Sequence, residues 1–152
     1  MGDNAEKALV DGLNGLLADH LALYMKTKNF HWHVKGPRFR DLHLLFDEQA
    51  QQILALVDVI AERVRKNGAA TLTSIGAVAA KTCIADDDDP ALDPGSMIGR
   101  LRDDNAGLVR TLKTVKALAG EAGDNATDGL IDDWTDQAEE RVWFLTALLA
   151  DV

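Results

Sequence analysis

The stretch "NFHWHVKGPRFRDLHLLFDEQ", residues Asn29–Gln49, carries three of the four histidines of this 152-residue chain and joins two long apolar repeats. Before it, residues 5–34 place apolar side chains at the three- and four-residue spacing of one helical face. Gly36-Pro37 interrupts that pattern, and a second one runs from about Phe39 to Lys66. At 1.5 Å per residue each helix is about 40 Å long. The stretch therefore predicts an antiparallel helical hairpin.

A long connection follows this hairpin. The segment "TLTSIGAVAAKT", residues 71–82, has the apolar spacing of a short helix, and "ADDDDPALDPG", residues 85–95, is typical of a solvated acidic loop. Asp93 and Pro94 are the residue types of a helix cap and first helical position. They predict a third long helix that ends near Gly120.

A fourth helical pattern comes after the turn "GEAGDN" and completes an all-α chain. Four long helices with a long second connection have the topology of ferritin-like four-helix bundles. We expect a single domain over residues 1–152, with a short extra helix in the connection between the second and third long helices.

The composition narrows the classes of function. Sixteen basic and 25 acidic residues give a formal net charge of −9, which opposes binding to phosphate backbones and favours cations. No apolar run approaches the roughly 20 residues of a membrane span, and the N-terminus lacks the features of a secretory signal. We expect a cytoplasmic protein, in the bacterial nucleoid or cytosol, that does not bind membranes. The single cysteine, Cys83, is interpreted as a small buried apolar residue.

The second helical pattern carries one polar stripe. His43 and Asp47 are four residues apart, as are Asp58 and Glu62, so each pair shares a helical face. Asp47 and Asp58 are nearly three whole turns apart, which aligns the two pairs but separates them by about 16 Å. One chain therefore cannot close a metal site from these four residues alone.

A second copy of the chain supplies the missing groups. If two such helices cross antiparallel about a two-fold axis midway between residues 52 and 53, position 43 faces position 62 and position 47 faces position 58. In the hairpin, His31 lies at the height of His43. The candidate site then combines one chain's histidines and first carboxylate with the partner's last two carboxylates: His31, His43 and Asp47 with Asp58 and Glu62 of the partner subunit.

This ligand set suits iron, zinc or manganese better than calcium or copper(I). His33 is excluded as a ligand of this site because it is two residues after His31, and residues two apart on a helix point about 200° away from each other. The alternative is a structural ion-pair network in which Arg40 and Arg63 neutralise the carboxylates. His20, in an apolar stretch, is interpreted as a hydrogen-bonded core histidine. The Glu-x-x-His motif of metal sites inside four-helix bundles does not occur.

Two segments resemble a known family. "HWHVKGPRFRDLHLLFD", residues 31–47, is similar to the first signature of the Dps mini-ferritins (DNA-binding proteins from starved cells), and "VDVIAERVRKNG", residues 57–68, resembles most of the second. One departure is Asn67, where the pattern has an apolar residue. The matching positions include the five candidate ligands and five others: Trp32, Gly36, Leu42, Ala61 and Arg63.

The resemblance implies a hollow dodecamer with ferroxidase centres at its two-fold interfaces. Such proteins oxidise Fe(II), generally with hydrogen peroxide, and store Fe(III) mineral, which protects DNA from oxidative damage. The resemblance makes His31, His43, Asp47, Asp58 and Glu62 iron ligands, with Zn²⁺ or Mn²⁺ as competitors, and Trp32 a candidate electron donor. It also places an acidic iron-entry pore near the start of the last helix, at Asp124, Asp128 and Asp132, with Glu121 or Asp133 as alternatives.

Direct DNA binding fits this chain less well than iron chemistry. Family members that bind DNA often carry a flexible basic tail, whereas this N-terminus offers only Lys7 and the C-terminus ends in "LLADV". The alternative function is nevertheless a nucleoid-associated, DNA-binding stress protein with secondary iron chemistry. A purely structural helical oligomer, and a cage whose metal centre has another reaction, also remain open.

Overall fold

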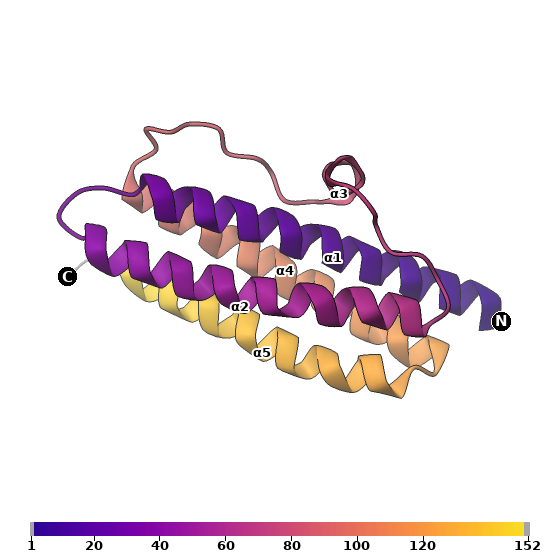
Figure 1. Cartoon of the computed structure of the whole chain (residues 1–152). Coiled ribbons are helices and arrows are strands. Elements are labelled where there is room, and N and C mark those ends of the chain that lie inside the picture. Colours follow the sequence, from indigo (N-terminus) through magenta and orange to yellow (C-terminus); the bar gives the residue numbers. More distant parts are fainter. Residues whose placement is uncertain (1, 151–152) are drawn as a thin grey trace.

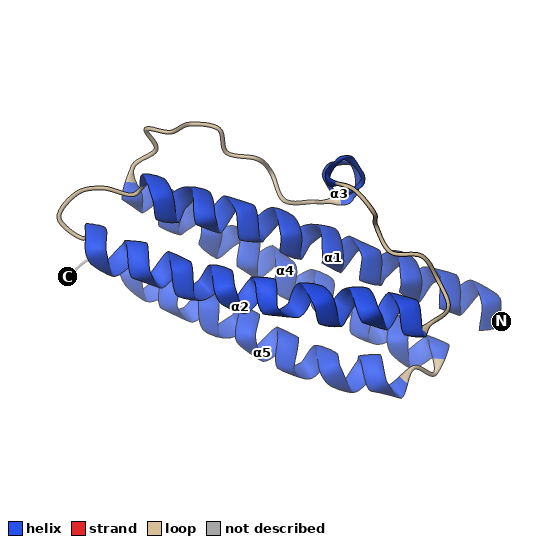
Figure 2. Cartoon of the chain, viewed as in Figure 1, coloured by secondary structure: helices blue, strands red, loops and turns tan. Residues whose placement is uncertain are grey.

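The computed structural model describes residues 2–150, which form helices and loops and no strand (Figures 1 and 2). The five helices of this part are α1 (Gly2–His33), α2 (Phe39–Lys66), α3 (Ile75–Lys81), α4 (Pro94–Ala122) and α5 (Asn125–Leu148). The four long helices lie side by side as a bundle, and α3 lies outside it in the connection between α2 and α4 (Figure 1). The predicted all-α architecture and its short extra helix are confirmed.

The core lies along the axis of the bundle, where each long helix contributes one apolar face. The fully buried side chains with the largest volumes include Phe30, Phe46 and Trp134. On α2 the buried positions recur at three- and four-residue spacing through Leu42 and Ile60. Because one face of α2 is committed to this core, its charged residues lie on the remaining surface.

The α1–α2 turn depends on a glycine. Gly36 has a φ of 108°, in the left-handed region that side chains with a Cβ rarely adopt. Its carbonyl accepts a hydrogen bond from the Phe39 amide at 3.0 Å, which starts α2. The turn brings the end of α1 beside the beginning of α2, as the hairpin prediction requires.

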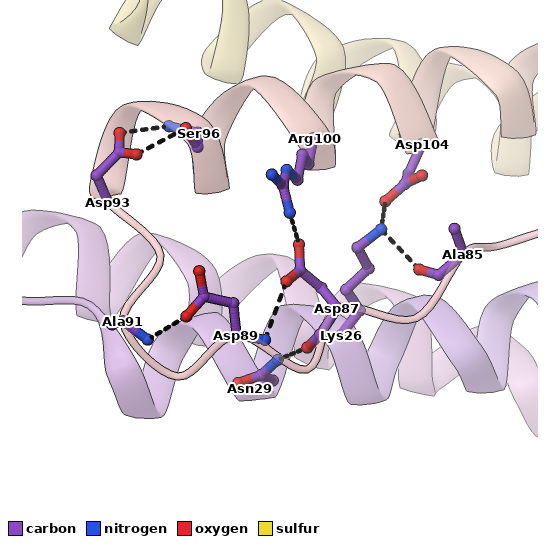
Figure 3. Close-up of polar contacts among 10 residues, drawn as sticks. All are labelled: Lys26, Asn29, Ala85, Asp87, Asp89, Ala91, Asp93, Ser96, Arg100 and Asp104. Atoms are coloured by element: carbon purple, nitrogen blue, oxygen red, sulfur yellow. Dashed lines mark hydrogen bonds and ion pairs between the residues drawn. The ribbon is translucent and has the colours of Figure 1, made fainter.

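The acidic connection is anchored to the bundle at Ala85 and Asp87 (Figure 3), whereas Asp86, Asp88 and Asp89 are exposed, as expected for a solvated loop. The Lys26 ammonium donates to the Ala85 carbonyl at 2.8 Å and forms an ion pair with Asp104 at 2.8 Å. Asn29 donates to the Asp87 carbonyl at 2.9 Å, and the Asp87 carboxylate pairs with Arg100. These contacts tie the connection to both α1 and α4.

Other positions also differ from the expectations. Cys83 is exposed rather than buried, because its segment crosses the outside of the bundle. Leu130, whose spacing on the last helix predicts an inward position, is 38% exposed. Trp143, whose residue type predicts a place in the core or in an interface, lies outside the core of this chain, and its ring packs edge-on against Phe144. The bundle consists of two helical hairpins, α1–α2 and α4–α5, and these side chains lie outside the core that the hairpins share.

Asp124 joins two helices at one end of the bundle. It is the N-cap of α5 and accepts a hydrogen bond from the Thr127 amide at 3.1 Å. Its carboxylate also accepts from Arg63 at 2.8 Å and from the Asn67 amide nitrogen at 2.9 Å, both at the end of α2. Asn67, the one departure from the family pattern, therefore has a structural partner in this chain.

Burial acts to raise the pKa of Asp124, but the hydrogen bonds from Thr127, Asn67 and Arg63 outweigh it and hold the pKa well below its usual range. A depressed carboxyl pKa contributes stability that is complete above the unfolded-state value, about 3.9. The contribution is lost as the pH falls through the folded-state pKa.

Replacing Asp124 with Asn keeps a good helix cap but removes the charge that Arg63 neutralises. We expect the variant to lose about 2 kcal/mol of unfolding free energy at pH 7. The difference from the parent chain should shrink progressively below about pH 4, because the unfolded parent chain then takes up a proton at this carboxyl that the folded chain does not. Urea unfolding at fixed protein concentration across pH 2–7 measures this. A difference that stays constant with pH would contradict the assignment.

Candidate metal centre

His31 and His43 face each other across the α1–α2 hairpin. His31 Nδ1 bonds to the His43 carbonyl at 2.6 Å, and His43 Nδ1 bonds to the His31 carbonyl at 2.7 Å. The two rings stack with their centroids 3.8 Å apart, and Phe39 stacks on the outer side of His43 at 5.0 Å. The adjacency predicted from the hairpin is therefore present in the structure.

This reciprocal pairing sets the chemistry of both rings. A carbonyl oxygen only accepts, so each Nδ1 must carry the proton. In the neutral ring, Nε2 then holds a lone pair that no backbone group uses. Metal-binding histidines are commonly oriented in this way, by a hydrogen bond from the other ring nitrogen to a carbonyl or carboxylate. The pair presents two oriented nitrogen ligands at one place on the surface.

Asp47 lies one turn beyond His43 on α2, and its carboxylate is occupied. Lys28, on α1, donates to Asp47 Oδ1 at 2.8 Å. That hydrogen bond, with the charge of the ammonium, lowers the pKa of Asp47. The same ammonium lies 5.9 Å from the centroid of the Trp32 ring, which is largely exposed. Lys28 thus links the candidate carboxylate to the candidate electron donor.

Asp58 and Glu62 lie on the same helix but do not join this group. Both are exposed, and within residues 2–150 neither forms an ion pair. Arg63 instead bonds to Asp124 and Thr127, so it does not neutralise these two carboxylates as the ion-pair alternative supposes. In the part of the chain that the structure describes, no three His, Cys, Asp or Glu side chains converge to hold a metal.

The surface beside the polar stripe is apolar. Leu44 and Leu54 on α2 are exposed, as is Met25 on α1. A groove of about 940 Å³ lies between α1 and the connection, and its lining includes Met25, Trp32, Leu72 and Ile75. Contiguous exposed apolar area can mark a surface that another protein molecule covers.

The candidate pore residues lie at the start of α5 but differ in surroundings. Asp124 is engaged in the helix cap and the Arg63 ion pair. Asp128 pairs with Lys116 on α4, which also lies 2.9 Å from Asp132 Oδ1. The two carboxylates raise the pKa of Lys116. Of the two alternatives, Asp133 accepts a hydrogen bond from Gln137 at 2.8 Å, and Glu121 is exposed near the end of α4.

Lys28 and Lys116 were not predicted from the sequence, because their partners come from other helices. A weak signal existed for Lys28, since it stands four residues before Trp32 and three before His31 on one helical face. No spacing pattern pointed to Lys116, which is 12 residues from Asp128 across the α4–α5 turn. Both residues place a positive charge beside a predicted metal-binding carboxylate.

None of the helices within residues 2–150 combines the length and the apolar content needed to cross a membrane.

Comparison with known proteins identifies the fold family. Residues 10–152 match the ferritin-like domain of the ferritin family. The DNA protection during starvation protein of Brevibacillus brevis is 33% identical over 137 residues, which cover 90% of this chain and 91% of the relative.

Solved structures agree with this match. The crystal structure of antigen TpF1 from Treponema pallidum has a TM-score of 0.94 at 31% identity and covers 97% of this chain and 95% of that chain. The Dps protein of Vibrio cholerae O1, described as a member of a broad superfamily of ferritin-like diiron-carboxylate proteins, has a TM-score of 0.91 at 31% identity, with 97% and 92% covered. The chain belongs to the ferritin-like family and, within it, to the Dps proteins.

Proposed function

We propose that this protein oxidises Fe(II) at centres shared between two chains and stores the Fe(III) product inside a closed homo-oligomer. The observation that carries the proposal is the reciprocal His31–His43 pair, which leaves two Nε2 lone pairs directed away from the backbone. Imidazole and carboxylate ligands suit iron. Fe(II) is the substrate here, so the site must bind it, allow electron loss and release Fe(III).

The second chain provides the remaining ligands. Asp58 and Glu62 are exposed and without ion pairs within residues 2–150, so they are available to a partner. A two-fold axis near residues 52 and 53 of α2 brings them to the partner's His43 and Asp47. The apolar neighbours Leu44 and Leu54 lie along the same helix and would be covered in that contact. We propose a dodecamer built from such dimers, as the family resemblance implies.

The proposed oxidant is hydrogen peroxide. Two Fe(II) ions each lose one electron, and one peroxide molecule takes up both electrons and two protons to give two molecules of water. Trp32, beside Lys28 at the edge of the centre, is the proposed electron donor when fewer iron ions are bound than the peroxide requires. Consuming iron and peroxide together would suppress hydroxyl radicals and so protect DNA.

Direct DNA binding is the second candidate function. The Brevibacillus relative is named as a DNA protection during starvation protein. The net charge of −9 per chain opposes contact with phosphates, because such contacts draw their affinity from Lys and Arg. We therefore propose that protection is chemical, and a gel-shift experiment at physiological salt distinguishes the two functions.

The shared centre is tested by mixing two defective chains. His43→Ala and Glu62→Ala should each slow rapid Fe(II) oxidation at every centre, because each symmetric dimer loses a ligand from both sites. In a mixed dimer one site carries both defects and the other carries neither. With random pairing, about a quarter of all sites become intact. Stopped-flow oxidation with peroxide should recover in proportion, as should tight binding of Zn²⁺, a redox-inert probe.

Two controls accompany this experiment. Glu48→Ala removes an exposed carboxylate from the same helix off the polar stripe, and it should leave oxidation and Zn²⁺ binding unchanged. Native mass spectrometry confirms that both chains are present in one assembly. Mixed assemblies that stay as slow as either variant would count against ligands shared across the two-fold axis.

Iron entry is tested at Asp128 and Asp132. If these carboxylates attract Fe(II) toward the interior, the double substitution with Asn should slow iron uptake severalfold at low ionic strength while single-turnover oxidation at the centre is retained. Asp124 is left intact because its replacement would disturb the α5 cap. Asp103→Asn, which removes one exposed carboxylate elsewhere on α4, is the control for a general loss of negative charge. Equal uptake by both variants would place iron entry elsewhere.

A further inference from the structure

Each long helix of the bundle places at least one polar side chain in the core. His20 on α1, Gln49 on α2, Asn105 on α4 and Arg141 on α5 are all 3% exposed or less. Asp and Glu are absent from this set, although an arginine at such a depth normally pairs with a carboxylate. The bundle therefore contains a buried positive charge.

Contacts between the helices place these side chains near one another. Arg141 Nε donates to Asn105 Oδ1 at 2.8 Å, and Asn105 Nδ2 donates to the Leu101 carbonyl at 2.8 Å. Arg63 bonds to Thr127 at one end of the α2–α5 pair and Arg38 to the Leu148 carbonyl at the other. Interpolation along α2 and α5 between these two contacts puts Gln49 at nearly the same height on the bundle axis as Arg141.

His20 belongs to the same group. Burial lowers its pKa to about 4, a backbone bond to Leu16 acts in the opposite direction, and the charge of Arg141 lowers it further. The ring is therefore neutral at pH 7. Because Nδ1 is 2.7 Å from the Leu16 carbonyl, it carries the proton and Nε2 is an acceptor.

The hydrogen-bonding groups of this cluster are not satisfied by protein. Nη1 and Nη2 of Arg141, both ends of the Gln49 amide and Nε2 of His20 are buried without a protein partner. The guanidinium nitrogens and the Gln49 amide nitrogen supply six N–H donors, whereas acceptors are few. Burial lowers the pKa of Arg141 to about 10, so it keeps its charge at pH 7. Donors therefore outnumber acceptors in the cluster, and within residues 2–150 no carboxylate forms an ion pair with Arg141.

We propose that the bundle core binds one small monovalent anion of chloride size, held by the Arg141 guanidinium and the Gln49 amide. Water would accept from the unpaired N–H groups but would leave the guanidinium charge uncompensated. An anion satisfies donors and charge together, and Asn105 fixes the orientation of Arg141 that receives it. This site is independent of the proposed iron centre, since none of its residues lies on the exposed polar stripe.

The direct test uses crystals of the unaltered protein grown with sodium bromide in place of chloride. Data collected at the bromine absorption edge should show an anomalous difference peak within hydrogen-bonding reach of Arg141 Nη1 or Nη2. A core that shows ordered water at these atoms and no anomalous signal would overturn the proposal.

A solution test measures whether chloride stabilises the folded protein. At constant ionic strength and protein concentration, with gluconate replacing chloride, the unfolding equilibrium constant should fall nearly tenfold for each tenfold rise in chloride above its dissociation constant. Arg141→Met removes the guanidinium charge, and Asn105→Leu is added because the Asn105 amide would otherwise lose its hydrogen-bond partner. This double variant should lose the chloride dependence of its stability. Arg110→Met, an exposed change of the same kind on α4, should retain it. Equal chloride dependence in all three proteins would contradict a site at Arg141.

Discussion

Four long helices can bury their apolar faces only against one another, and the other features of this molecule follow from that constraint. On α2 the core takes the face that includes Leu42, Phe46 and Ile60. The charged stripe must then lie outside the core, where one chain spreads its carboxylates over about 16 Å. A compact set of the proposed ligands would require a second molecule. The need for a partner thus arises from the way the first molecule satisfies its own core.

Much of this arrangement could be predicted from the sequence, because helix periodicity and turn residues are local signals. Gly36-Pro37 marked the hairpin turn, and the hairpin placed His31 beside His43, where the structure has the two rings 3.8 Å apart. What periodicity could not provide was the partner of each polar atom. The exchange of hydrogen bonds between the histidines and the opposite carbonyls depends on side-chain torsions and on the spacing of two helices. Asp87 shows the same limit, since its acidic surroundings indicated solvent and its partner Arg100 comes from another helix. The ligand roles of these residues stay predictions.

Although the chain has a negative net charge, several of its carboxylates lie beside a basic side chain. Asp47 has Lys28, Asp124 has Arg63, and Asp128 and Asp132 share Lys116. Each pair places an ammonium or guanidinium where a cation would otherwise bind, so an arriving metal ion has to displace it or share the carboxylate with it. Asp58 and Glu62 differ, since neither forms an ion pair within residues 2–150. In the proposed centre, the carboxylate Asp47 from one chain is therefore already paired with an ammonium, whereas the partner's two carboxylates are not.

The order of elements along the chain has a consequence for synthesis. All five proposed ligands lie between His31 and Glu62, within the first hairpin, whereas the second hairpin, α4–α5, comes after a connection of 27 residues, from Asn67 to Asp93. Contacts between neighbours in sequence form faster than those that close long loops. A nascent chain emerging from the ribosome therefore displays all five proposed ligands, together with uncovered apolar surface, before the residues that finish its core have been added. The time needed to translate the connection adds to the time for which the first hairpin remains without α4 and α5.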